Sequence, residues 1–72
     1  MEQLKKDKQA YENLDTGYTA LLKGNVETAL KLAQEGLHMQ PREAHLYNLK
    51  GKALVAQGRY QEALDSFDRA IA

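Results

Sequence analysis

Small residues recur along this chain at a spacing of 34 residues. Four pairs of positions at this spacing carry identical residues: Gly17 and Gly51, Gly24 and Gly58, Ala29 and Ala63, Leu30 and Leu64. A fixed period of this length is typical of stacked supersecondary units. The recurrence therefore predicts a repeat fold made of two copies of one unit, and it constrains the fold more than any other feature of the sequence.

Glycine and proline divide the chain into four segments whose apolar residues follow a helical period. Breaks are expected near Gly24, Pro41 and Gly58, because glycine ends helices and proline cannot continue them. The expected helices cover about residues 3–23, 26–38, 43–57 and 60 to the end. The first shows the period most clearly, with Leu4, Tyr11, Leu14, Tyr18 and Leu21 on one face. Because the connections are short, neighbouring helices should be antiparallel. We therefore expect an all-α fold of four helices, arranged as helix–turn–helix repeats.

Two glycines fall inside expected helices at matching places. Glycine within a helix costs about 0.5–1 kcal/mol relative to alanine, so a matched pair suggests a packing reason. We expect Gly17 to lie opposite Ala29, and Gly51 opposite Ala63, where two helix backbones approach closely.

Length and composition exclude several classes of protein. A chain of 72 residues forms one small domain at most. Its 10 acidic and 10 basic residues are interspersed, so it lacks the basic stripe of a nucleic-acid binder. The first residues lack the apolar core of a signal peptide, and no run approaches the ~18 apolar residues of a membrane span. We expect a soluble domain, and the sequence does not identify its compartment.

No residue pattern indicates catalysis, a metal or a cofactor. Cysteine is absent, and the histidines His38 and His45 do not form an HExxH or similar spacing. The glycines lack the clustering and the following lysine of a phosphate-binding loop. We therefore expect no enzyme activity, no cofactor and no metal site in this chain.

The 34-residue pattern resembles the tetratricopeptide repeat. That signature places Trp, Leu, Gly and Tyr on a first helix, then Ala, Phe and Ala on a second, and ends with Pro. A unit beginning at Ala44 carries Tyr47, Lys50, Gly51, Leu54, Ala63, Phe67 and Ala70 at the places before the proline. A unit beginning at Ala10 carries Asn13, Thr16, Gly17, Ala20, Ala29, Ala33, Gly36 and Pro41, and matches outright only at Gly17, Ala29 and Pro41. The resemblance implies an α-solenoid domain over residues 1–72. Its units would be about 10–43 and 44–72, with a helix extension at 3–9.

The resemblance also implies a binding surface. In this family the first helix of each unit lines a groove that holds a peptide. Carried over to this sequence, the groove residues are Tyr11, Leu14, Tyr18, Leu21, His45, Asn48, Lys52 and Val55. Asn48 and Lys52 would meet a carboxylate or a peptide carbonyl. Leu14 and Tyr18 stand where family members that clamp the acidic tails of chaperones have polar groups, so that activity is not carried over. The alternatives are helix packing for the Tyr11, Leu14 and Tyr18 stripe, and plain solvent exposure for Asn48 and Lys52.

The last expected helix has an apolar side with no partner helix in the sequence. In repeat arrays each unit buries its face against the next. Leu64, Phe67 and Ile71 would remain uncovered, and such faces usually mark an interface. We therefore expect either a fragment of a longer array or a module that self-associates, for example as a homodimer through this helix.

Together these features predict a non-catalytic module that binds a protein or peptide, without nucleic acid or membrane as partner. Two alternatives remain at this point. One is an accessory segment of a larger enzyme such as a zinc metallopeptidase, which an upstream HExxH-bearing domain would reveal. The other is a purely structural oligomerisation element.

Overall fold

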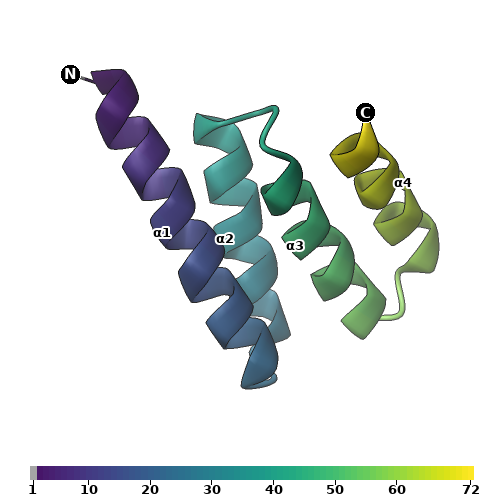
Figure 1. The fold of residues 1–72 in the computed structure, drawn as a ribbon. Coiled ribbons are helices and arrows are strands. Elements are labelled where there is room, and N and C mark those ends of the chain that lie inside the picture. The colour runs from purple at the N-terminus through teal and green to yellow at the C-terminus, as the bar shows by residue number, and fades with distance from the viewer. Residues whose placement is uncertain (1) are drawn as a thin grey trace.

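The computed structural model describes the backbone of residues 2–72 and the side chains from Lys8 onward. It contains four helices: α1 (Glu2–Leu22), α2 (Val26–Met39), α3 (Ala44–Ala56) and α4 (Tyr60–Ile71). Neighbouring helices run antiparallel and form two hairpins, with α1 and α4 at opposite edges (Figure 1). This confirms the predicted all-α fold of four helices, whose ends lie within a residue or two of those expected. Leu4 lies outside the residues whose side chains are described.

The two hairpin turns have the same backbone conformation. Gly24 and Gly58 adopt φ values of 83° and 77°, which favour glycine because a Cβ clashes with the backbone in that region. After α1, the amide of Asn25 bonds the Ala20 carbonyl at 2.8 Å, and after α3 the amide of Arg59 bonds the Leu54 carbonyl at 2.9 Å. These are the six-to-one hydrogen bonds of the Schellman motif, which satisfies carbonyls at a helix end. The two glycines at which helix breaks were predicted thus form C-terminal helix caps of the same type.

The core is made mainly of alanine and leucine. Ala29, Ala33, Leu49 and Ala53 are fully buried, and they join α2 to α3 with Ala20 of α1. Alanine lets helix axes come close, because no long side chain separates the backbones. Within the described residues, α3 contacts each of the other helices, whereas α4 packs only against α3. The third helix is therefore the centre of the fold.

The helical glycines lie in close contacts between helices. The atoms nearest to a Cβ built on Gly17 belong to Leu49 of α3 and Leu32 of α2, rather than to Ala29. On Gly51, a Cβ would lie 2.5 Å from the Phe67 ring of α4. Leucine and phenylalanine side chains therefore come nearest to the two glycines, while the expected approach of Ala29 and Ala63, which are both buried, stays a prediction. These larger side chains reach across to fill the space that each glycine leaves.

The two hairpins fill this space in different ways. Phe67 covers Gly51 within the second hairpin, but the residue 34 positions before Phe67 is Ala33, which is too short to cover Gly17. Leu49 of the second hairpin takes that place, and its Cδ2 atom would lie 2.5 Å from a Cβ on Gly17. The weaker repeat pattern of the first hairpin is thus compensated by a residue from the next.

One polar side chain lies in the interior of the first hairpin. Asn13 is only 5% exposed, and its Nδ2 atom donates a hydrogen bond to the Leu32 carbonyl at 3.3 Å. Its Oδ1 atom accepts one from Nε2 of Gln9 at 3.0 Å. Buried polar groups need such partners, because an unpaired group costs about 1–3 kcal/mol. Asn13 therefore ties α1 to α2 where the second hairpin has Tyr47 at the matching position.

Among the described residues, none of the helices is both long enough and apolar enough to span a membrane.

Candidate functional site

The predicted groove residues form two matched rows, one on α1 and one on α3. We call their joint surface the α1/α3 face; it consists of Tyr11, Leu14, Tyr18, Leu21, His45, Asn48, Lys52 and Val55. Each α1 residue lies 34 positions before its α3 counterpart, so that Tyr18 corresponds to Lys52. Helix spacing of three and four residues places each row on one side of its helix.

Tyr18 of α1 contacts two residues of α3 on this face. Nδ2 of Asn48 donates a hydrogen bond to the Tyr18 hydroxyl at 3.3 Å. The Nζ atom of Lys52 lies over the Tyr18 ring, 5.3 Å from its centroid. That separation is within the range of a cation–π interaction, worth about 0.5–1 kcal/mol at an exposed site. Tyr18, Asn48 and Lys52 therefore form one cluster, which we call the Tyr18 cluster.

Apart from His45, the other members of the face fall into two groups. Leu14 and Leu21 are half-buried and pack against the hydrophobic core. Tyr11 is 57% exposed and Val55 is 42% exposed, so their side chains remain available to a ligand. The face thus has a polar centre in the Tyr18 cluster and apolar surface toward its two ends.

His45 lies at the start of α3 and has a local partner. Its Nδ1 atom is 2.9 Å from Oε1 of Glu43, and the same oxygen accepts a bond from the His45 amide at 3.3 Å. The hydrogen bond from His45 lowers the pKa of the Glu43 carboxyl from its ordinary value, although partial burial acts in the opposite direction. Glu43 thereby caps the N-terminus of α3, where a negative charge is favourable. This pair stabilises the helix end, and the exposed His45 ring stands at the edge of the face.

The three residues predicted to mediate self-association lie on α4. Leu64 is 54% exposed and Ile71 is 85% exposed. Phe67 is half-buried, because part of its ring packs against Gly51 within the hairpin. Two of the three are therefore free to contact another molecule, and the third is shared between the hairpin and the surface.

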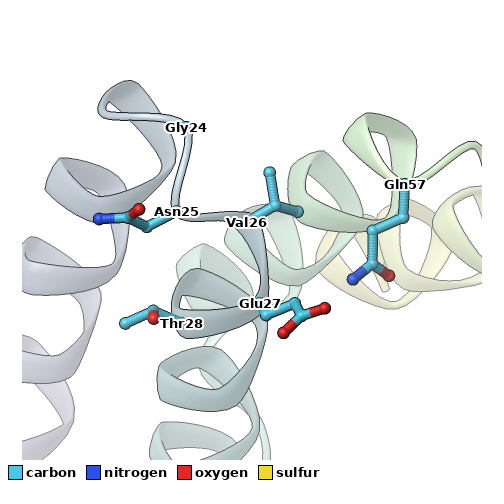
Figure 2. A pocket seen from close by; sticks show the side chains of 6 residues that line it. All are labelled: Gly24, Asn25, Val26, Glu27, Thr28 and Gln57. Carbon is cyan, nitrogen blue, oxygen red and sulfur yellow. The ribbon is translucent and has the colours of Figure 1, made fainter.

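A separate pocket lies at the turn of the first hairpin, and none of its lining residues was a predicted site residue. It has a volume of about 440 Å³ and is lined by Gly24, Asn25, Val26, Glu27, Thr28 and Gln57. Figure 2 shows Val26 and Glu27 pointing to the side on which Gln57 of the α3 terminus lies. Asn25 and Thr28 point to the opposite side, toward α1. The pocket is open and lies away from the Tyr18 cluster, with no convergent set of charged groups.

The contact between Tyr18 and Lys52 was not predicted, although the sequence held a signal for it. The two residues occupy equivalent positions of successive units, and equivalent positions of stacked units lie side by side. The burial of Asn13 was also missed. Asn13 aligns with Tyr47 at the 34-residue spacing, and the large side chain of the second hairpin at this position could have indicated that Asn13 is buried.

The fold is an array of antiparallel helix pairs, the class of α-solenoid proteins. A family model described as tetratricopeptide repeat matches residues 14–72, and the chain belongs to this family. No curated protein and no solved structure matches the chain. Tetratricopeptide repeats generally mediate interactions between proteins and are typically non-catalytic.

Proposed function

We propose that this chain is a non-catalytic interaction module whose α1/α3 face binds a peptide segment of a partner protein. The observation that carries the proposal is the Tyr18 cluster. It places an amide, a hydroxyl and an ammonium group side by side on a surface shared by both hairpins. The division into units at about 10–43 and 44–72 is part of the same proposal.

The chemistry of the face suits a peptide in extended conformation. Lys52 is exposed and carries no carboxylate partner among the described salt bridges, so its ammonium group can pair with a carboxylate of the ligand. The half-buried Asn48 amide has an acceptor oxygen as well as donor hydrogens, which suits a peptide backbone. Tyr11 and Val55 offer apolar surface on the two helices. We therefore propose a ligand with a carboxylate flanked by apolar side chains.

The test is a selection with a defined probe. A random dodecapeptide library is panned on the immobilised chain, with counter-selection on the variant that carries Asn48→Ala and Lys52→Ala. Recovered peptides are then measured by isothermal titration calorimetry against the intact chain and single variants. We expect Lys52→Ala to weaken binding about tenfold, equal to ~1.4 kcal/mol. Lys31→Ala serves as the matched control, because Lys31 is an exposed lysine on α2.

Two results would contradict the proposal. If the recovered peptides bound Lys52→Ala as tightly as they bind the intact chain and the Lys31→Ala control, the binding surface would lie elsewhere. A solution mass above that of a monomer, reduced by Tyr11→Ser, would instead assign the α1/α3 face to self-assembly. That second result would favour the structural oligomerisation element.

A further inference from the structure

A second pocket lies between α2, α3 and α4, and none of its lining residues belongs to the α1/α3 face. Lys50 lies between Asn48 and Lys52 in the sequence, but helix residues two positions apart do not face the same side. The pocket is therefore separate from the Tyr18 cluster. We call it the Lys50 pocket; it has a volume of about 350 Å³ and is lined by Gln34, Leu37, His38, Tyr47, Lys50, Asp65, Ser66 and Arg69.

Lys50 is a cation at a place where the repeat signature has an apolar residue. In the unit that begins at Ala44, it takes the place of the signature leucine. Lys50 is half-buried, and none of the salt bridges among the described residues includes it. Partial burial of an unpaired charge costs free energy, and departures from a folding rule are expected mainly at functional sites. Lys50 is thus the first indication that the pocket receives a negatively charged ligand.

Ser66 supplies a second, independent indication. The residue is only 4% exposed, and no hydrogen bond joins its hydroxyl to another described residue. Among the described residues no fully enclosed polar side-chain atom lacks a partner, so this hydroxyl opens onto the pocket that it lines. Buried polar groups normally have a hydrogen-bond partner. An oxygen atom of a ligand in the pocket would accept the hydrogen bond that the chain itself does not.

Arg69 brings a second positive charge to the pocket, and this charge already has a partner. The Nε atom of Arg69 lies 3.5 Å from Oδ2 of Asp65, and both side chains are exposed. The lining residues therefore contain two cations against one carboxylate, a net charge of +1 that belongs to Lys50. A guanidinium group has five N–H donors, so those of Arg69 that do not point to Asp65 remain available to a ligand.

We propose that the Lys50 pocket binds a phosphate monoester. Its donors come from three helices: Gln34 and His38 of α2, Lys50 of α3, and Ser66 and Arg69 of α4. Donors on several sides suit the tetrahedral oxygens of a phosphate group better than the two coplanar oxygens of a carboxylate. Lysine binds phosphate as a point charge, and a phosphate monoester carries about −1.5 to −2 at pH 7. Because the α1/α3 face takes no part, the inference does not rest on the proposed function.

The test is an NMR titration of the 15N-labelled full chain with N-acetyl-O-phosphoserine amide. The ionic strength is held constant, because salt screens charges at an exposed pocket. We expect shifts that centre on the amides of residues 34–38, 47–50 and 65–69 and that saturate in the millimolar range. N-acetylglutamate amide is the matched carboxylate probe, and it should bind several-fold more weakly.

A second phosphate monoester distinguishes the two sources of such a group. Glycerol 3-phosphate is titrated under the same conditions. Tighter binding of the phosphoserine probe would assign the pocket to a phosphorylated side chain of a protein. Tighter binding of glycerol 3-phosphate would assign it to a free small molecule. Either result supports the site.

Variants of the chain separate binding from folding. Lys50→Leu restores the residue of the repeat signature, so it should not lower the urea midpoint, but it should weaken binding of the phosphoserine probe about tenfold. Lys50→Arg keeps the charge and should retain binding. Ser66→Ala should weaken binding several-fold without loss of stability, because its hydroxyl has no partner in the described chain. Lys23→Gln is the matched control, since Lys23 is exposed and does not line the pocket.

Three results would overturn the proposal. One is the absence of shifts around Lys50 and Ser66 at the highest probe concentration. Another is equal binding of the phosphate and carboxylate probes. The third is a Lys50→Leu variant that binds the phosphoserine probe as tightly as the Lys23→Gln control does.

Discussion

Replacing Gly51 by alanine should destabilise the domain, even though alanine is the better helix former. Gly51 has ordinary helical φ, so alanine would gain about 1 kcal/mol from helix propensity alone. The added Cβ, however, would lie 2.5 Å from Cε1 of Phe67 and 2.8 Å from Cδ1 and Cζ. Real Cβ atoms do not approach other atoms so closely, so the ring or the helix must move. Overpacking of this kind costs about 1–3 kcal/mol.

The net effect follows from these two magnitudes. Subtracting the propensity gain from the packing cost gives a loss of roughly 0–2 kcal/mol, centred near 1 kcal/mol. In a domain of this size, a loss of 1 kcal/mol lowers Tm by about 4–8 °C. Urea and thermal unfolding followed by far-UV circular dichroism measure both quantities. The fall in stability should appear without a change in helix content.

A double-mutant cycle isolates the contact with the ring. In the Phe67→Ala background the obstacle is gone, and Gly51→Ala should then stabilise the domain by about 1 kcal/mol. The two backgrounds are compared in trimethylamine N-oxide, which keeps the weaker variants folded. The reasoning would be refuted if Gly51→Ala raised Tm in the wild-type background, or lowered it equally in both.

Three further perturbations test the turns, the buried amide and the helix cap. Gly24→Ala and Gly58→Ala should each cost about 1–2 kcal/mol, because φ is left-handed at both sites while a Cβ would meet no atom within 4 Å; equal stability of either variant in urea would speak against the strain. Asn13→Ala should cost about 1 kcal/mol by removing a buried hydrogen bond, with a Tm shift as the readout; an unchanged Tm would contradict it. Because the folded-state pKa of Glu43 is lowered, its stabilisation is complete above the unfolded value near 4.5 and is lost as the pH falls through the folded pKa. The Tm difference between the wild type and Glu43→Gln should therefore shrink in that acidic window, and a difference that grew on acidification would contradict the sign.

Local signals in the sequence determine most of this fold. Gly24 and Gly58 mark the two helix stops, and the structure shows both in the same left-handed conformation. The apolar period locates the four helices to within a residue or two. These features depend on residues close in the chain, so they can be read without knowing how the helices pack.

Packing partners are harder to predict, because they depend on side-chain reach across helices. The sequence indicates that Gly17 lies in a close contact, but it does not show that Leu49 of the next hairpin comes nearest to this glycine. The small size of Ala33 can be read at its own position in the sequence. The residue that fills the space beside Gly17, Leu49, belongs to the next hairpin. Repeat position alone does not contain this information.

The candidate site is predictable to a similar extent. The repeat register places Tyr18 and Lys52 at equivalent positions, and the structure brings the ammonium group over the ring. Helix packing was the alternative for Leu14, and in the structure Leu14 and Leu21 do pack partly against the core. The spacing alone does not separate the two uses, because a packing row and a binding row have the same period. The identity of the partner depends on the partner's own residues, which this sequence does not contain.

The most direct test of the central proposal is a map of the bound peptide on the protein. The 15N-labelled chain is titrated with a peptide recovered by panning, and the shifted amides are assigned by NMR. The proposal predicts that the shifts cluster in residues 11–21 and 45–55 and that Lys52→Ala reduces them at equal peptide concentration. Shifts confined to α4 or to the turn at Gly24, with Lys52→Ala without effect, would show that the α1/α3 face is not the binding surface.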